Sequence, residues 1–282
     1  DKLLRGQSTL SLKMNVTEGN VWVAEANIRN PQITVNAKAP NGAASQIDLT
    51  AKLANLGLLL PEFPGPVTVS GTAIDESQGL RLNLQAQGPG QINATVAGLV
   101  AGGGRADLTI KGTGQAALAN PFIEPRALSG GLNFDLRLNG PTQLASLTGR
   151  VSLSGGRISS PDLPFALQDA SLVSELSGGQ AQITGQAAVS TGGTTTISGS
   201  VGLAAPNTAD LAFGLRGVVL RDPQLYETRA SGDLTIRGPL VGGALIAGTI
   251  ALRDTELQIP SSGLGGVEAI PDLRHIREPG PV

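Results

Sequence analysis

The 282-residue chain has no cysteine, and only 2% of its residues are aromatic. The first absence excludes a disulfide framework and thiolate metal sites, and it is compatible with an oxidising or a reducing compartment. The second absence leaves an apolar surface made almost entirely of Leu, Ile, Val and Ala, because hydrophobic residues still make up 40% of the chain. The sequence can therefore build a large apolar surface, and that surface is aliphatic.

Charge and long apolar runs are also scarce. Charged residues make up 15% of the chain and the formal net charge is −2, so nothing electrostatic favours a nucleic-acid partner. No apolar run approaches the length of a membrane-spanning helix. The opening segment, Asp1 to Leu10, lacks the charged-then-apolar pattern of a signal peptide. We expect no nucleic-acid partner, and we expect a portion of a longer protein whose export signal or anchor lies elsewhere.

Residues that carry chemistry are few. The single histidine, His275, lies in "IPDLRHIREPGP", where nothing marks a nucleophilic serine elbow. One imidazole without cysteine leaves only scattered carboxylates for a metal, and no EF-hand loop is present. We therefore expect a loop histidine, no catalytic residue, no metal and no cofactor. The sequence does not exclude a catalytic pair of carboxylates of the glycosidase kind, because the proximity of two carboxylates depends on the tertiary fold.

The segment "IKGTGQAALANP" matches a loose dinucleotide-binding pattern through Gly112, Gly114 and Ala117. That pattern requires a helix directly after the glycines. Pro121 follows within a few residues, and no acidic residue closes a βαβ unit. We interpret the glycines as a turn between strands.

Alternation with a period of two dominates the chain. In "SGGLNFDLRLNGP" the apolar residues Leu132, Phe134, Leu136 and Leu138 share one parity, and polar residues fill the other. Such alternation predicts a strand with one apolar face. Similar segments recur from Leu10 to Ile259 and predict more than a dozen strands. Residues 48–60 fit either a strand or a helical turn or two.

Glycine pairs separate many of these segments. Gly155–Gly156, Gly178–Gly179 and Gly192–Gly193 each lie between two alternating runs. Two-residue hairpin loops need positive φ, which glycine adopts readily. The sequence therefore predicts an all-β fold, a long and mostly antiparallel meandering sheet with few or no helices.

A long-range repeat supports a modular sheet. The segments 139–161 and 237–260 superpose with one inserted residue, so that Gly149, Val151 and Leu153 match Gly248, Ile250 and Leu252. Repeated meanders suggest similar units stacked side by side. We expect one continuous β-fragment over 1–282, with quasi-repeats near 130–161 and 230–260 and a Gly/Pro-rich loop or tail at 261–282.

The apolar faces need a partner, and three kinds are possible: a second sheet, a partner chain, or a non-protein apolar ligand. A uniform aliphatic surface suits mobile acyl chains as well as a protein core. A structural or adhesive β-solenoid, such as an autotransporter passenger, is the alternative fold, and it predicts parallel coils of constant length. An open sheet would also expose edge strands that could pair with other strands.

Four segments in this order carry a family resemblance: "LLLPEFPGPVTVSGTA" (58–73), "PRALSGGLNFDLRLNGP" (125–141), "LTGRVSLSGGRISSPDLPFALQDASL" (147–172) and "GTIALRDTELQIPSSGLGGVEAI" (248–270). Together they resemble the TamB family of translocation and assembly module subunits, within the AsmA-like envelope proteins. The resemblance implies a sheet folded lengthwise into a U-shaped hydrophobic groove, called a β-taco. It also implies a periplasmic location, as an internal part of an inner-membrane-anchored protein of Gram-negative bacteria.

The implied function is that of a conduit for phospholipid transport between inner and outer membranes, together with outer-membrane protein assembly. The implied partners are phospholipid acyl chains, an outer-membrane barrel of the TamA type and nascent outer-membrane protein strands. The family offers no catalytic residues to transfer. The candidate groove-lining residues are Leu82, Leu84, Leu132, Phe134, Leu136, Leu138, Val151, Leu153, Ile236, Ile250 and Leu252.

Overall fold

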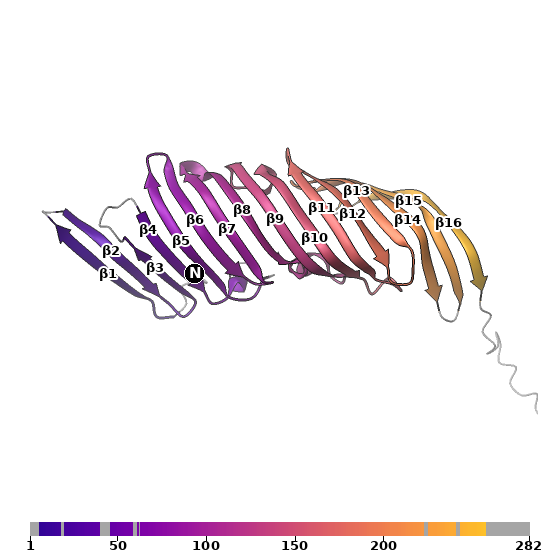
Figure 1. The fold of residues 1–282 in the computed structure, drawn as a ribbon, viewed down its shortest axis with the longest axis horizontal. Helices are drawn as coiled ribbons and strands as arrows, with labels where there is room; N and C mark the ends of the chain where they lie inside the picture. The colour runs from indigo at the N-terminus through magenta and orange to yellow at the C-terminus, as the bar shows by residue number, and fades with distance from the viewer. Residues whose placement is uncertain are drawn as a thin grey trace, which may run out of the picture.

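A computed structural model describes residues 6–17, 20–39, 46–58, 61, 63–222, 225–240 and 243–257. In these ranges the chain forms one sheet of sixteen strands, and each strand pairs antiparallel with the next along the chain (Figure 1). The predicted all-β antiparallel meander is therefore confirmed. The proposed loop or tail at 261–282, with His275, lies outside the described residues.

The strands of the first half are mostly six to eleven residues long. They are β1 (Thr9–Thr17), β2 (Asn20–Arg29), β3 (Ile33–Lys38), β4 (Gln46–Leu53), β5 (Val67–Glu76), β6 (Gly79–Gly88), β7 (Ile92–Ala101) and β8 (Arg105–Gln115). The strands of the second half reach fifteen residues. They are β9 (Ala127–Pro141), β10 (Leu147–Ser159), β11 (Leu167–Ser177), β12 (Gln180–Val189), β13 (Thr194–Gly202), β14 (Thr208–Asp222), β15 (Tyr226–Pro239) and β16 (Leu245–Leu257).

Helical structure is confined to short turns between strands. These are η1 (Leu56–Leu58), η2 (Gly102–Gly104), η3 (Ala116–Ala119), α1 (Asn120–Ile123) and η4 (Leu144–Ser146). The ambiguous segment 48–60 thus contains the end of β4 and the single turn η1, and its last two residues lie outside the described residues. The longest helical segment, η3 followed by α1, joins β8 to β9, directly after the glycines of the dinucleotide-like pattern.

Strand register gathers the apolar residues on one face. Leu136 of β9 lies opposite Ile110 of β8 and Gly149 of β10, whereas Arg137 lies opposite Thr109 and Thr148. Directly opposed residues in an antiparallel sheet project to the same side. The apolar positions of each strand therefore lie opposite the apolar positions of its neighbours. As a result, the sheet has one aliphatic face and one polar face.

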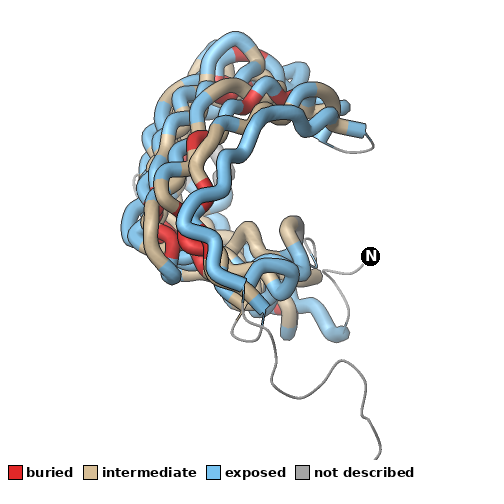
Figure 2. The backbone as a smooth tube through the Cα atoms, turned by 90° about the vertical axis from the view of Figure 1, so that its right-hand side faces the viewer, coloured by how far each residue is buried: buried red, intermediate tan, exposed pale blue. Residues whose placement is uncertain are grey.

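The sheet curls about its long axis. Viewed end-on, the strands trace an open C (Figure 2). The register shifts between Ser154 and Arg157 of β10, between Gln168 and Ser171 of β11, and between Leu215 and Val218 of β14. Such bulges add an unpaired residue and bend the strand. They recur in the long strands of the second half and mark a corner at which these strands turn.

Two sequence interpretations of glycine pairs are wrong. Gly155 and Gly156 were expected in a hairpin loop but lie inside β10, where Gly155 has a φ of 58° in the bulge. Gly112 and Gly114 were expected in a turn but lie inside β8. A bulge demands positive φ just as a hairpin loop does, so glycine alone does not distinguish them. The loops expected at 178–179 and 192–193 are confirmed.

No second layer covers the aliphatic face within the described residues. Each strand makes its main contacts with its two neighbours in the sheet, and the other sizeable contacts join η3, α1 and η4 to β9 or η3 to α1. The buried apolar residues are mostly alanines, and no large side chain there is fully buried. The β-solenoid alternative is wrong, because its coils would stack in parallel whereas every strand pair here is antiparallel.

The repeat corresponds to two equivalent hairpins. The first segment runs from the end of β9 through β10, and the second from the end of β15 into β16. Gly149 and Gly248 occupy matching positions, with φ of 116° and 152°. A residue of positive φ, Gly155 in β10 and Asp254 in β16, follows each of them within the strand. Pro260, the last match of the second segment, lies outside the described residues.

Glycines inside strands permit the coiling of the sheet. Gly71, Gly98 and Gly149 have φ between 116° and 152°, a region that residues with a Cβ rarely adopt. Each lies on the aliphatic face opposite a leucine: Leu84, Leu108 and Leu136. A Cβ at Gly149 would overlap the carbonyl oxygen of Asp135 on the neighbouring strand. The backbones therefore approach too closely there for any other residue.

Substitution of Gly149 by alanine should destabilise the fold by about 1–3 kcal/mol, through the strained φ and the overlap with Asp135. Chemical denaturation followed by circular dichroism measures the loss. Gly131→Ala on β9 is the matched control, because its Cβ would meet only Ser154 at 3.6 Å or beyond. Equal losses in the two variants would refute the special role of Gly149.

The polar face is crossed by ion pairs between strands. Lys111 of β8 contacts Asp135 of β9 at 2.9 Å, and Arg137 of β9 reaches back to Asp107 of β8 at the same distance. The hydrogen bonds that Arg137 donates lower the pKa of Asp107 below its ordinary value of 3.8, aided by its charge. Both partners are about half exposed or more. Such pairs contribute little each and mainly favour the native register.

Acid should weaken the sheet through these carboxylates. Because the pKa of Asp107 is lowered on folding, the unfolded chain binds the proton first. The stability that this carboxylate contributes is present above its ordinary pKa and is lost as pH falls through the lowered pKa of the folded state. Arg137→Gln should return the pKa of Asp107 toward 3.8, as read by carboxyl NMR titration. Arg105→Gln removes an exposed arginine of the same strand as Asp107 and should leave the pKa of Asp107 unchanged. An unchanged pKa in Arg137→Gln would contradict the assignment.

Candidate functional site

The candidate site is the aliphatic face of the sheet, which forms the inner surface of the C. Following the register from strand to strand shows that this face is continuous. One row runs across β6 to β11 through Leu84, Val96, Ile110, Leu136, Gly149 and Leu176. A second row runs across β10 to β16 through Leu153, Leu172, Gly185, Ile197, Phe213, Leu234 and Gly248.

All eleven residues predicted to line a groove lie on this face. Strands β6, β9 and β10 carry Leu82, Leu84, Leu132, Phe134, Leu136, Leu138, Val151 and Leu153. Strands β15 and β16 carry Ile236, Ile250 and Leu252. Their exposure differs along the sheet. Leu138 and Leu153 are buried among neighbours, whereas Ile250 and Leu252 on the edge strand are about half exposed. Their contact with a ligand stays a prediction.

Burial identifies the aliphatic face as the concave one. Side chains on the inner side of a bend converge and shield one another, and those on the outer side diverge. Ala230 and Val218 on the aliphatic face are 1% and 2% exposed without a covering layer, whereas the charged side chains of Lys111 and Arg137 on the polar face are more than half exposed. The curled sheet therefore presents its aliphatic residues to the hollow and its charges to the outside.

Small residues occupy the inside of the corner. One cluster joins Ala116 of η3 with Leu153, Ala170 and Ala187. The next joins Val189, Val218 and Ala230. Where a sheet bends sharply, little volume is left on its inner side, so alanine and valine fit and larger side chains would overpack. Apart from Leu153, these residues were not predicted from the sequence, and the alanines were missed because an alanine within an alternating run carries a weak hydrophobic signal.

A hollow lies on the inner face beside this corner. Its volume is about 130 Å³, and apolar side chains make almost all of its surface. It is lined by Leu153, Ile158, Leu167, Ala170, Ser171, Leu172, Gln186, Ala187, Thr195, Thr196, Ile197 and Phe213. Of these lining residues, only Leu153 was predicted from the sequence to line a groove. The others belong to alternating strands, but sequence does not show which part of an alternating face is hollowed.

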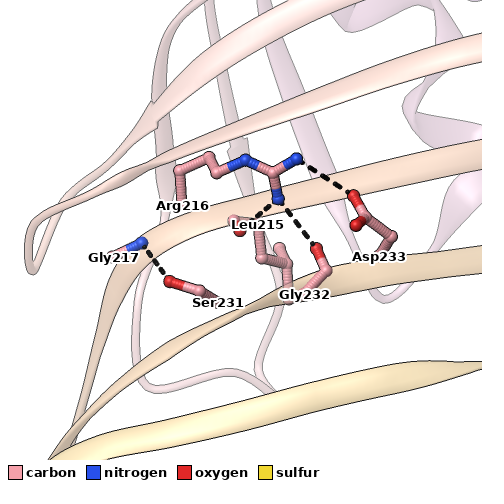
Figure 3. A network of polar contacts seen from close by, with 6 residues as sticks. All are labelled: Leu215, Arg216, Gly217, Ser231, Gly232 and Asp233. Atoms are coloured by element: carbon pink, nitrogen blue, oxygen red, sulfur yellow. Dashed lines mark hydrogen bonds and ion pairs between the residues drawn. The ribbon is translucent and has the colours of Figure 1, made fainter.

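A polar network holds the bulge of β14 in place (Figure 3). The Arg216 guanidinium donates hydrogen bonds to the carbonyl oxygens of Leu215 and Gly232, at 2.9 and 3.3 Å, and to the Asp233 carboxylate at 3.2 Å. The Gly217 amide donates to the Ser231 hydroxyl at 2.9 Å. Gly217 lies within the register shift between Leu215 and Val218, so the Ser231 hydroxyl gives a partner to an amide inside the bulge. The corner is thereby fixed from the polar side.

Ser231→Ala should loosen this corner. Loss of the acceptor leaves the Gly217 amide without its partner, at a cost of about 1 kcal/mol, so its hydrogen exchange should rise about fivefold. Exchange measured by NMR or mass spectrometry reports the change. Ser198→Ala, an exposed substitution on β13, is the control and should leave Gly217 unaffected. Unchanged exchange in Ser231→Ala would show that the hydroxyl does not hold the bulge.

Within the described residues no helix is long and apolar enough to cross a membrane, and no three acidic or histidine side chains converge as metal ligands would. The expectations that the chain is not an enzyme and holds no cofactor stay predictions. The site offers a shaped, uncharged surface and no reacting group that the geometry singles out.

Comparison with known proteins links the C-terminal part of the chain to a known family. Residues 180–279 match the TamB C-terminal domain, so the match covers β12 to β16 and continues beyond the described residues. A search of curated proteins and of solved structures found no match to the chain. The family match agrees with the strand-and-turn resemblance and with the curled antiparallel sheet. Residues 180–279 are therefore similar to the C-terminal domain of TamB, over 100 of the 282 residues of the chain.

Proposed function

We propose that this chain is a section of a periplasmic conduit that shelters phospholipid acyl chains between the inner and outer membranes. The observation that carries the proposal is the composition of the inner face. Away from the strand ends, the inner positions of β6 to β15 carry no charged side chain. A continuous uncharged surface that no second layer of the described residues covers needs an apolar occupant to keep it from water.

Energetics favour an acyl chain as that occupant. Each buried methylene gains about 0.8 kcal/mol, so complete shelter of a chain of about sixteen carbons would gain on the order of 12 kcal/mol, and shelter on one side about half of that. The aliphatic lining offers almost no hydrogen-bonding group that would hold one position more tightly than the next. A chain bound by such a surface can slide along it.

The open side of the C gives the polar head group a place. The backbone traces a C that is open on one side (Figure 2), so a head group can stay in water while the acyl chains contact the inner face. This arrangement avoids the cost of burying a charged phosphate without partners. A groove open along its length suits an amphipathic lipid better than a closed tube would.

The sheet edges support a second role, in the assembly of outer-membrane proteins. Among the described residues β1 pairs only with β2, and β16 only with β15. All thirteen residues of β16 are exposed. Edge strands with free backbone groups add further strands readily. We propose that this edge pairs with strands of a client protein or of an outer-membrane barrel partner of the TamA type, in an envelope protein anchored in the inner membrane.

A charge on the inner face should abolish lipid binding. Leu136→Asp places a carboxylate in the central row, where an acyl chain would strip it of water, so the amount of phospholipid that copurifies should fall by about tenfold or more. Native mass spectrometry of protein extracted under mild conditions measures the bound lipid. Asn133→Asp, on the polar face of the same strand, is the matched control and should retain lipid.

The two variants separate the proposed roles. Leu136→Asp leaves the β16 edge intact, so strand pairing at that edge should persist when lipid is lost. Wild-type protein that carries no phospholipid, or a Leu136→Asp variant that carries as much as Asn133→Asp, would refute the conduit. Circular dichroism confirms that both variants keep the sheet.

A further inference from the structure

The hollow beside the corner is bordered by several strands at once. Its walls come from five successive strands, β10 to β14, and they include Leu153, Ala170 and Ala187 of the buried cluster. Ala116 of the β8–β9 connection is fully buried in that same cluster. The connection therefore fixes the corner wall from outside the five strands.

The lining of the hollow excludes a polar occupant. Ser171, Gln186 and Thr196 line it only from the backbone side, because they are directly opposed on neighbouring strands and belong to the exposed polar face. Thr195 is the one polar lining residue whose register position is on the inner face. A head group or an extended peptide would leave its charges or amides unpaired against these walls. A hydrocarbon has no polar group, so it loses no hydrogen bond when it enters the hollow.

Volume sets the size of that hydrocarbon. Apolar cavities of about 150 Å³ stay dry and bind molecules as small as benzene. The hollow, at about 130 Å³, has room for a few carbon atoms and is far too small for a whole lipid. The shape that fits is the end of a flexible chain.

We propose that this hollow binds the terminal methyl segment of a phospholipid acyl chain and is a resting position on the inner face. The inference rests on the proposed conduit and adds a defined site to it. A chain whose end enters the hollow is enclosed on several sides, whereas elsewhere on the face it is covered on one. Enclosure of about two further methylene groups corresponds to about tenfold in occupancy.

Position-specific crosslinking tests the site. The protein is incubated with vesicles of phosphatidylethanolamine and phosphatidylglycerol in which the palmitoyl chain carries a diazirine either on its terminal carbon or at mid-chain. After illumination, mass spectrometry maps the attachment points. The terminal label should attach to Leu172, Ile197 and Phe213 about tenfold more than to Leu84, Val96 and Ile110, whereas the mid-chain label should show no such preference.

A cavity-filling variant provides the second measurement. Thr195→Phe places a ring in the hollow and should reduce attachment of the terminal label to Leu172 and Phe213 about tenfold, with mid-chain attachment elsewhere retained. Val96→Phe, on the inner face outside the hollow, is the matched control and should change neither. Should Thr195→Phe fail to fold, the wild-type map alone decides the question.

The outcomes distinguish the resting site from the conduit. Terminal labels spread evenly along the inner face, or unaffected by Thr195→Phe in a folded protein, would overturn the resting site and leave the conduit standing. The absence of attachment anywhere on the inner face would overturn both. Concentration of the terminal label in the hollow supports both.

Discussion

In-register antiparallel pairing is the constraint on which the rest of the molecule depends. Because side chains alternate sides along a strand, a slip of one residue would move every leucine of that strand to the opposite face. Sixteen strands keep the same assignment of faces, across bulges that insert extra residues in several of them. The ion pairs of the polar face oppose such slips, because a shift of register would separate Lys111 from Asp135. A single inner surface exists only while all these registers hold.

Curvature adds the second requirement, and glycine and alanine meet it in different ways. Glycines such as Gly71 and Gly149 let neighbouring backbones approach and coil, at positions opposite large leucines. Alanines such as Ala187 and Ala230 leave room inside the corner. The two residue types together explain how a chain with few aromatic residues forms a curved surface that is filled in some places and hollowed in others.

Much of this architecture follows from local sequence patterns. The alternation around Leu132 and Leu136 predicts both the strand and the face it presents, and the pairs at 178–179 and 192–193 predict the turns that join antiparallel neighbours. Gly155 and Gly156 were misplaced because their φ requirement is common to loops and bulges, and only the pairing of β10 with its neighbours decides between them. The curl of the sheet was predicted from the family resemblance and not from the residues. It depends on bulges in separate strands that lie next to one another only in the folded sheet. For the same reason the hollow near Ile197 and Phe213 had no sequence signal.

The nearest-neighbour strand order has a consequence for the dimensions of such proteins. Strands in a sheet are spaced about 4.8 Å apart, so sixteen of them extend about 70 Å along the axis perpendicular to the strands. Because each hairpin contacts chiefly the hairpins beside it, gain or loss of one hairpin changes this reach by about 10 Å and leaves the cross-section unaltered. Duplication of a unit such as β9–β10 is thus a simple route by which evolution can lengthen the molecule without changing its cross-section.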